Sequence, residues 1–338
     1  MSSLAVKYRP QEFEDVVGQV SIIKILQRQL EINDVKNCYL FCGPSGTGKT
    51  TLARIFANKI NNGQGTPIEI DGASNNGVDN VREIIKQAKE RSIDSEYKIY
   101  IIDECHQITT PAWNAFLKCI EEPPKYTIFM FCTTEPNKIP NTILNRVMRF
   151  NLNRVPVEQI KNRLLYICQQ EGYTNYVETC DYVSKLSYGG VRDAIATLEK
   201  ASSYSTDLEI NNVLQCLGSI NYGILFDLTD VMLRRDEANV VGIVNYCFNL
   251  GVDLKLFVNQ FMDFTLDVFK FCLFRDLSLT KLPSIYQNNL LAIVNFDNSK
   301  DYYSRVASRL MQLSNNLKNE INPLTMVTIS LLDIVRGY

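Results

Sequence analysis

The sequence predicts an α/β domain followed by an all-helical region, and three observations support this. Residues 1 to about 152 alternate short β-branched or aromatic runs with segments of helical periodicity, the pattern of a parallel sheet covered on both faces. After residue 156 the strand signal fades and amphipathic helical patterns take over. The chain has 338 residues, more than one ordinary core holds, so two or three domains are expected.

The predicted elements follow the chain in order. Five runs are expected to form the sheet: 37–41, 67–71, 98–103, 127–132 and 148–152. Helices are expected between them in GKTTLARIFANKI, VDNVREIIKQAKER and PAWNAFLKCIEE. Three further segments, PVEQIKNRLLYICQQEG, VETCDYVSKLSYGG and VRDAIATLEKASSYS, predict a small helical domain, and apolar stripes such as LFVNQFMDFTLDVFKFCLF predict helices beyond it. We therefore predict domains at 1–153, 154–206 and 207–338.

Composition and charge exclude several classes of protein. Hydrophobic residues make up 46% and charged residues 21%, as in globular proteins. No run of 18 apolar residues occurs, and MSSLAVKYRPQEF lacks the apolar segment of a signal peptide, so we expect a cytoplasmic protein without membrane contact. The net charge is −2, so any DNA contact must come from a local basic patch.

The ten cysteines are scattered singly and no CxxC motif occurs, which is typical of buried, reduced thiols. The one close pair, Cys38 and Cys42, lies in a strand-like run, where residues four apart are roughly 13 Å from each other. That separation is too large for a shared zinc ion or a disulfide.

GPSGTGKT at 43–50 matches G-x-x-x-x-G-K-[ST], directly after an apolar strand and directly before a helix. In this context the glycines let the backbone N–H groups surround phosphate oxygens. Lys49 is expected to reach the β and γ phosphates, and the Thr50 hydroxyl to be a Mg²⁺ ligand. The residues expected to contact ATP are Gly43, Pro44, Ser45, Gly46, Thr47, Gly48, Lys49, Thr50 and Thr51.

The run KIYIIDE predicts a buried strand that delivers two acids to the same site. Asp103 is expected in the Mg²⁺ shell, and Glu104 is expected to orient or deprotonate the attacking water. The alternative, that the two acids only begin a helix, is less consistent with a complete phosphate loop. The sequence therefore predicts an ATPase.

IIDECH contains the only histidine and differs by one letter from the DEAH box of many helicases. His106 could couple ATP to a second site, but a histidine at a strand end is more typical of a satisfied polar residue packed by its neighbours. This stretch alone does not decide for a helicase.

Two arginines and one of two adjacent threonines are further candidates for the nucleotide site. Thr133 or Thr134, at the end of the central strand, is expected beside Asp103. Arg146, after a capping Asn145, is predicted at the domain's edge, where it meets a neighbour more readily than its own nucleotide. Arg192 lies in SYGGVRDAIATLEKA and is placed to fold over a bound γ-phosphate. Taken singly, each arginine is equally typical of an ordinary surface residue.

Several motifs follow in order across residues 6–201: VKYRPQEFEDVVGQ, YLFCGPSGTGKTTLARIFA, EIDGASNNGVDNVREI, YIIDECHQITTPAWNAFLKCIEEPP, TTEPNKIPNTILNRVMRF and GGVRDAIATLEKA. In these the chain resembles bacterial DNA polymerase III gamma/tau subunits, the ATPases of sliding-clamp loaders, and more distantly the small subunits of replication factor C. The resemblance implies an AAA+ P-loop NTPase module, a three-helix lid and a C-terminal helical collar in a pentameric ring with other clamp-loader subunits. It argues against a helicase, which needs a second RecA-like domain.

The resemblance also implies roles for named residues. Val17 and Gly18 would border the adenine, Thr134 and Arg192 would be the two sensors, and Arg146 would reach the neighbour's ATP. The helix VDNVREIIKQAKER would face primer-template DNA, which makes Arg82, Lys86 and Lys89 candidate phosphate contacts; alternatively they pair with Glu83 and Glu90 on a solvated face. Trp113 and Ile108 are candidate contacts to the sliding clamp, although a lone tryptophan is more typical of a core.

Three departures from the family pattern qualify these expectations. The four-cysteine zinc module of gamma/tau subunits is replaced by a short loop in NKINNGQGTPIEID, so no zinc is predicted. The Ser-Arg-Cys triplet reads Asn145-Arg146-Val147. The sequence ends at LLDIVRGY after the expected collar, so contacts to polymerase and helicase are not predicted, and a cellular or phage origin stays open.

Two other functions compete with a clamp-loader ATPase. A Holliday-junction motor would share the phosphate loop, but it would carry a winged-helix domain, and no β-hairpin signal appears after residue 207. A non-catalytic scaffold subunit would have lost its phosphate loop, which is intact here.

Overall fold

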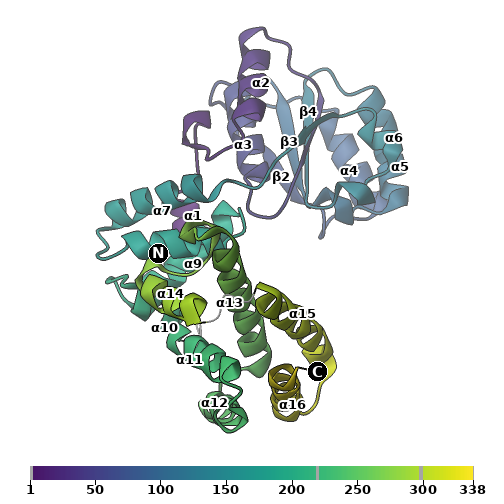
Figure 1. The fold of residues 1–338 in the computed structure, drawn as a ribbon. Coiled ribbons are helices and arrows are strands. Elements are labelled where there is room, and N and C mark those ends of the chain that lie inside the picture. The colour runs from purple at the N-terminus through teal and green to yellow at the C-terminus, as the bar shows by residue number, and fades with distance from the viewer. Residues whose placement is uncertain (1–2, 218–220, 297–299, 338) are drawn as a thin grey trace. The chain divides into compact units, whose positions relative to one another are not determined.

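The structure is a computed structural model that describes residues 3–217, 221–296 and 300–337 (Figure 1). These residues form two compact units: one comprises the chain up to Ile167 with Ser187–Glu199, and the other comprises Cys168–Leu186 with the chain from Lys200 onward. The division runs through α7 (Val157–Glu171) and α9 (Val191–Tyr204), two helices of the predicted 154–206 domain. The three-domain division therefore stays a prediction.

The first unit is built on five parallel strands, each within one residue of its predicted bounds at either end. They are β1 (Cys38–Cys42), β2 (Ile68–Asp71), β3 (Lys98–Asp103), β4 (Thr127–Thr133) and β5 (Met148–Asn151). The order across the sheet is β2-β3-β4-β1-β5. This confirms the predicted α/β fold, and it brings the carboxyl ends of β1, β3 and β4 to one edge, where open α/β sheets bind ligands.

Helices cover both faces of the sheet because alternate residues of each strand point to opposite sides. Tyr39 and Phe41 of β1 belong to the core that includes α2 (Val20–Glu31) and α3 (Lys49–Ile60). Leu40 and its strand neighbours Cys38 and Cys42 belong to the core on the other face. That core includes residues of α4 (Val78–Ala88), α5 (Thr110–Glu121) and α6 (Asn141–Leu144). Figure 1 shows the strands between these two helical layers.

Short elements complete the first unit. A short helix, α1 (Leu4–Lys7), lies near the N-terminus, and a 3-10 turn, η1 (Phe13–Asp15), follows it. Two more 3-10 turns, η2 (Cys105–Gln107) and η3 (Pro136–Lys138), directly follow the carboxyl ends of β3 and β4. These two turns hold the polar side chains described below.

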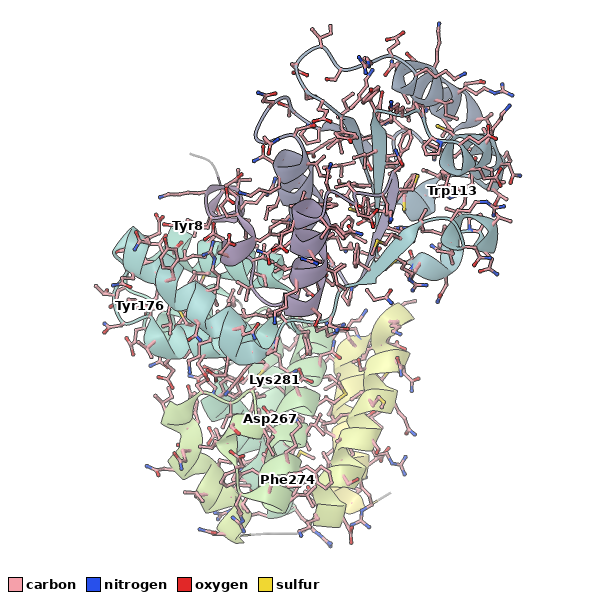
Figure 2. All side chains as sticks on the ribbon, turned by 90° about the horizontal axis from the view of Figure 1, so that it is seen from above. Tyr8, Trp113, Tyr176, Asp267, Phe274 and Lys281 are labelled. Carbon is pink, nitrogen blue, oxygen red and sulfur yellow. The ribbon has the colours of Figure 1, made fainter. Side chains whose placement is uncertain are left out.

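Trp113 and Ile108 are core residues, not surface contacts. Trp113 is 1% exposed and Ile108 is 6% exposed. The indole ring lies 5.2 Å from the Phe131 ring and 6.0 Å from the Phe116 ring (Figure 2). The apolar stripe of α5 turns Trp113 toward the sheet, and Ile108, which precedes α5, packs in the same core. These two side chains are therefore not available to a sliding clamp.

The second unit is helical. Its helices beyond α7 and α9 are α8 (Val177–Leu186), α10 (Ile210–Cys216), α11 (Tyr222–Leu233), α12 (Glu237–Asn249), α13 (Leu254–Phe274), α14 (Gln287–Phe296), α15 (Lys300–Asn316) and α16 (Pro323–Arg336). Three 3-10 turns lie at Leu277–Leu279, Ser284–Tyr286 and Leu317–Asn319. The core centres on α13, which the Asp253 carboxylate caps by accepting from the N–H groups of Lys255 and Leu256.

None of the helices described, α13 included, has the length and apolar character needed to span a bilayer. Nine of the ten cysteines are buried. Burial raises the pKa of the Cys38 thiol to about 12, so its metal-binding thiolate form is disfavoured. Within the described ranges, no group of three or more His, Cys, Asp and Glu side chains is arranged to hold a metal ion.

A buried carboxyl on α13 gives this unit a testable pH dependence. Asp267 is 3% exposed; it accepts a hydrogen bond from the Lys281 backbone N–H at 2.8 Å and lies 3.3 Å from the Lys270 ammonium (Figure 2). Burial raises the pKa of the Asp267 carboxyl above its ordinary value, against the lowering effect of Lys270 and the Lys281 N–H. The folded chain therefore keeps this proton to higher pH than the unfolded chain does.

Consequently, this group's contribution to the free energy of unfolding falls as pH rises from about 3.8 through the raised pKa. Asp267→Asn removes the titrating carboxyl and with it this pH dependence, while the side-chain amide oxygen can still accept a hydrogen bond from the Lys281 backbone N–H. Urea unfolding across that acid range should show the variant gaining stability relative to the wild type as pH rises. Carboxyls of lowered pKa, such as Asp236, make stability change with pH in the opposite direction. Their effect is the same in both proteins, so it cancels when the wild-type free energy of unfolding is subtracted from that of the variant. A difference that shrinks as pH rises would contradict the expectation.

Candidate nucleotide-binding site

The loop 43–50 is folded as a tight cradle between β1 and α3. Gly43 approaches the backbone so closely that a Cβ there would lie 2.6 Å from the Leu152 carbonyl oxygen. Gly46 has φ +71°, a conformation that favours glycine, and a Cβ there would lie 3.2 Å from Gly190. Helix α3 begins at Lys49, within the last two residues of this segment, so its first N–H groups face the cradle.

Lys49 is a buried cation with neutral partners. The residue is 6% exposed, and its ammonium donates to the carbonyl oxygens of Gly43 at 3.0 Å and Pro44 at 2.9 Å. No acidic side chain of the described chain forms an ion pair with it. A buried charge without a counter-charge is costly, so the ammonium favours an anion in the cradle, as a triphosphate would supply.

Thr50 and Asp103 converge from two elements that are 53 positions apart. The Thr50 hydroxyl, at the start of α3, donates to the Asp103 carboxylate at the end of β3 over 2.7 Å. A hydroxyl and a carboxylate side by side are the hard oxygen ligands that Mg²⁺ prefers. The two side chains thus fit the predicted Mg²⁺ site.

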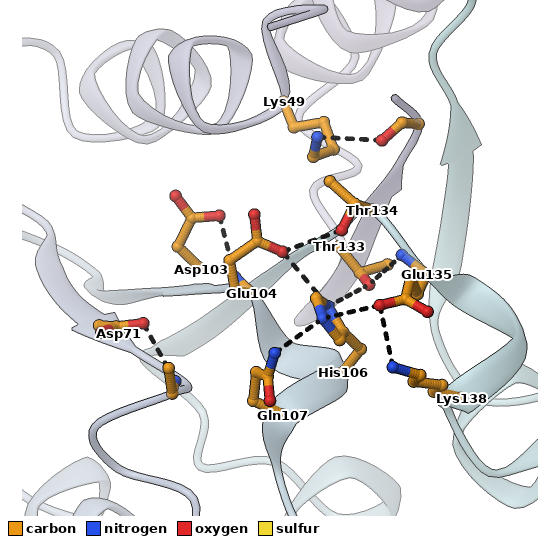
Figure 3. A network of polar contacts seen from close by, with 12 residues as sticks. Lys49, Asp71, Asp103, Glu104, His106, Gln107, Thr133, Thr134, Glu135 and Lys138 are labelled. Carbon is orange, nitrogen blue, oxygen red and sulfur yellow. Dashed lines mark hydrogen bonds and ion pairs between the residues drawn. The ribbon is translucent and has the colours of Figure 1, made fainter. Parts of the chain in front are cut away.

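Glu104 is held in position by both backbone and side-chain contacts (Figure 3). It lies in the left-handed region, with φ 45°, between β3 and η2. Its carboxylate accepts a hydrogen bond from the Thr134 hydroxyl at 3.2 Å and lies 3.2 Å from Nδ1 of His106. The predicted catalytic acid and the predicted sensor therefore touch directly.

His106 lies at the centre of this network (Figure 3). Its ring is 5% exposed, Nδ1 lies 3.2 Å from the Thr133 hydroxyl, and Nε2 lies 3.3 Å from the Glu135 carboxylate. Glu135 in turn forms an ion pair with Lys138 at 2.9 Å. The residue is buried and hydrogen-bonded, as expected for a satisfied polar group, but its partners include the predicted catalytic acid.

This geometry predicts that His106 positions Glu104. We expect His106→Ala to lower kcat for ATP hydrolysis by about 10–100-fold, because the carboxylate then keeps only one of its two side-chain partners. The Kd for ATP should stay unchanged, since the ring is absent from the pocket lining. Stopped-flow nucleotide binding and steady-state hydrolysis separate the two effects. Gln107→Ala, at the exposed neighbour that contacts only Nε2, is the matched control. Equal losses in both variants, or a loss of binding, would contradict this role.

A cavity of about 340 Å³ adjoins these residues within the first unit. Of the predicted ATP contacts, those in its wall are Val17, Ser45, Gly46, Thr47, Gly48, Lys49, Thr50, Thr51, Asp103, Glu104 and Arg192. Arg192 is brought there because the Val191 N–H donates to the Gly46 carbonyl at 2.9 Å. The wall does not include Gly18, Gly43, Pro44 or Thr134. Gly18 packs beside Val155, and Thr134 meets the site through Glu104.

The cavity wall also contains residues for which the sequence predicted no role. They are Ala5, Tyr8, Arg9, Pro10, Val16, Arg54, Arg163, Val191 and Ile195. Arg163 of α7 donates to the Tyr8 carbonyl at 2.8 Å and lies over the Tyr166 ring, which ties the N-terminal segment to this helix. Tyr8, Arg9 and Pro10 belong to the VKYRP segment, but the sequence does not indicate that this segment lies beside the cavity.

Arg146 lies outside this cavity. Asn145 ends α6, and the guanidinium that follows forms an ion pair with Glu121 at 2.7 Å and donates to the Thr142 carbonyl at 2.7 Å. Its side chain is 38% exposed. Arg146 is thus held at the surface and is available to a neighbouring molecule.

The outer face of α4 and its C-terminal cap carry three exposed cations. Arg82, Lys86 and Lys89 follow one another at helical spacing. Arg82 forms an ion pair with Asp79 at 3.2 Å, not with Glu83. Lys86 and Lys89 have no ion pair with an acid of the described chain, so the alternative pairing with Glu83 and Glu90 is not observed there.

Comparison with known proteins gives matches over most of the chain. A family model described as DNA polymerase III, delta subunit, matches residues 67–156, and one described as DNA polymerase III subunits gamma and tau domain III matches residues 208–296. DNA polymerase III subunit tau of Bacillus subtilis is 37% identical over 268 residues, which are 73% of this chain and 48% of that protein. DNA polymerase III subunit gamma of Buchnera aphidicola from Acyrthosiphon pisum is 32% identical over 287 residues, 77% of this chain and 78% of that protein.

The chain spans about half the length of the tau and gamma/tau proteins that it matches. Among solved structures, the Thermotoga maritima RuvB Holliday junction branch migration motor aligns with a TM-score of 0.53 at 18% identity, over 73% of this chain and 86% of that one. At this identity the likeness concerns the fold alone.

Proposed function

Because the chain belongs to the DNA polymerase III gamma/tau family, we propose that it is an ATP-hydrolysing subunit of a sliding-clamp loader. The observation that carries the ATPase proposal is the meeting of Lys49, Thr50, Asp103 and Glu104 at one edge of the sheet. Scaffold subunits without a phosphate loop would not need this set. Residues 208–217, 221–296 and 300–337 contain helices and no strand, which does not fit the winged-helix domain expected of a Holliday-junction motor.

The chain's own residues divide the hydrolysis step among them. The loop N–H groups and the Lys49 ammonium bind the β and γ phosphates. Thr50 and Asp103 would hold Mg²⁺, which neutralises charge on the phosphate oxygens. Glu104, fixed by Thr134 and His106, orients the attacking water and accepts its proton.

Two arginines would link hydrolysis to assembly. Arg192, at the start of α9, reaches the γ-phosphate of its own chain and so couples that helix to the cradle. Arg146, outside its own cavity, would complete the site of the adjacent subunit. In the proposed pentameric ring, ATP binding opens the sliding clamp for primer-template DNA, and hydrolysis releases it closed. We expect this activity in the cytoplasm, and the similarity to subunits of bacterial DNA polymerase III supports that location.

The test is ATP hydrolysis by the chain assembled with its partner subunits. We expect primed DNA and sliding clamp together to stimulate the rate well beyond either alone. A rate that neither ligand changes, in an assembly that hydrolyses ATP, would contradict the clamp-loader role while leaving the ATPase intact.

We also propose that Arg82 and Lys86 of α4, together with Lys89 at its C-terminal cap, contact the DNA phosphates. Each alanine substitution should weaken binding of the assembled complex equally across DNA sequences. It should also reduce the slope of log K against log salt by roughly 0.9 for each duplex phosphate that the variant no longer neutralises. Lys24→Ala, on α2 at the other face of the sheet, is the charge-matched control. Salt slopes that match the control would place the DNA elsewhere.

A further inference from the structure

The second unit contains a hollow that plays no part in the nucleotide site. It lies at the C-terminal end of α11, beside α15 and α16, and has a volume of about 460 Å³. Arg235, Arg305 and Arg309 line it, and we call it the arginine hollow. This volume lies in the range of small-molecule and side-chain pockets.

The arginine hollow has a one-sided charge. Its lining includes no Asp or Glu. No acidic side chain among the described residues forms an ion pair with any of the three arginines. Neighbouring arginines behave differently: Arg234 pairs with Asp230 at 2.9 Å, and Arg336 pairs with Glu237 at 2.6 Å. The two neighbouring arginines that pair with acids, Arg234 and Arg336, do not line the hollow.

Arg235 also occupies an unusual backbone position for a large side chain. It follows the end of α11 with φ +58°, and its N–H donates to the Met232 carbonyl at 3.1 Å while that of Asp236 donates to Val231 at 2.9 Å. Glycine is the usual residue at this point of a helix end, and other residues cost about 1 kcal/mol or more there. The chain thus has an arginine at a left-handed position that glycine would adopt with less strain.

The remaining lining combines the polar Ser304, Ser308 and Gln312 with a group of apolar residues, and this group favours one class of ligand. Met232, Val306 and Ile334 form a buried floor, and half-buried Leu233 adjoins Arg235. Arginine forks bind carboxylates and phosphates equally well. A nucleic-acid backbone has no apolar group for such a floor, whereas a peptide that combines acidic and apolar side chains matches both features.

We propose that the arginine hollow docks an acidic peptide segment of a partner protein, with its carboxylates on Arg235, Arg305 and Arg309 and an apolar side chain against Leu233. This interaction does not involve the nucleotide or the residues of the first unit. Because the arginines are exposed, it weakens as salt increases.

The test uses the full chain and fluorescein-labelled dodecapeptides followed by anisotropy. A pool alternates Asp or Glu with Leu or Phe; a second probe replaces every apolar residue by Ser; a third is a twelve-residue oligothymidylate. We expect the acidic-apolar pool to bind most tightly. Arg305→Ala with Arg309→Ala should weaken it by about tenfold or more, because two charge-assisted hydrogen-bonding groups are removed. Arg234→Ala, on the neighbouring arginine that already has an acidic partner, should change it less than twofold.

Further variants separate the two halves of the proposal. Leu233→Ser should weaken the acidic-apolar pool but not the serine peptide, and Arg309→Lys should restore only part of the affinity that Arg309→Ala removes. The proposal is overturned if the pool does not bind, if the double variant binds it as well as the wild type does, or if oligothymidylate binds more tightly through the same arginines. It is also overturned if the double variant changes only the oligomeric state, since the hollow would then be a contact between copies.

Discussion

Lys49→Ala is expected to weaken ATP binding strongly. The ammonium is buried and bonded to two loop carbonyls, so the substitution removes the cation that faces the phosphates and leaves an apolar gap in the cradle. Truncating one partner of a buried charge pair typically costs about 2–5 kcal/mol, which corresponds to roughly 30- to 5,000-fold in Kd. Isothermal titration with ATP and Mg²⁺ measures it directly, and hydrolysis should fall to background.

The control for this prediction is Lys24→Ala, which removes an exposed lysine from the neighbouring helix α2. Its Kd for ATP should equal that of the wild type. Thermal unfolding of the ligand-free proteins shows whether Lys49→Ala still folds. If a folded Lys49→Ala variant binds ATP within a few-fold of the wild type, the proposal that this cradle binds the phosphates is wrong.

Arg146→Ala has the second large expected effect, and it should appear only in the assembled complex. A guanidinium supplied from a neighbour stabilises charge in the transition state and contributes about 10³- to 10⁵-fold in rate. Since Arg146 lies outside the cavity of its own chain, the Kd for ATP of the separate chain should not change. Single-turnover hydrolysis by the complex, alongside nucleotide binding, tests both statements.

Glu121→Gln is the matched variant. It removes the acid that holds the guanidinium at 2.7 Å but keeps the guanidinium itself. Exposed ion pairs contribute only about 0–1 kcal/mol, so neither variant should affect folding. Glu121→Gln should retain hydrolysis. If its activity fell as far as that of Arg146→Ala, the ion pair with Glu121 would be the important feature, and the proposed role of Arg146 in the neighbour's ATP site would be wrong.

Most of the α/β fold could be predicted because local patterns determine it. Each strand begins and ends within one residue of the predicted run, since β-branched and aromatic stretches are bounded by loop residues. The cradle was predictable for the same reason: its residues are contiguous in GPSGTGKT, and its neighbours in the sequence are a strand and a helix.

The contacts between distant segments could not be predicted in this way. Arg163 reaches the Tyr8 carbonyl across 155 positions, and neither segment carries a motif that specifies the other. The contacts of His106 with Thr133 and Glu135 depend on β3 and β4 being neighbours in the sheet. Periodicity gives the strands but not their order, so these partners emerge only from the tertiary structure.

Burial also resolved some of the alternatives that the sequence left open. Trp113 and Ile108 follow the acidic pair, where either a surface contact or a core position was consistent with the sequence. Trp113 turns toward the sheet because it lies on the same stripe of α5 as Phe116 and Ile120, and Ile108, just before α5, packs in the same core. On α4 the apolar stripe that contains Val81 and Ile84 faces the core, so the residues on the opposite side of this helix stay exposed.

The most direct measurement combines the two inactive variants in one reconstituted ring. An Arg146→Ala subunit keeps a working cradle, and a Lys49→Ala subunit keeps a working guanidinium. If the ATP site is shared between adjacent subunits, mixing the two should restore hydrolysis well above the level of either variant alone. If each chain instead completes its own site, the mixture stays as inactive as its components, and the shared site is refuted.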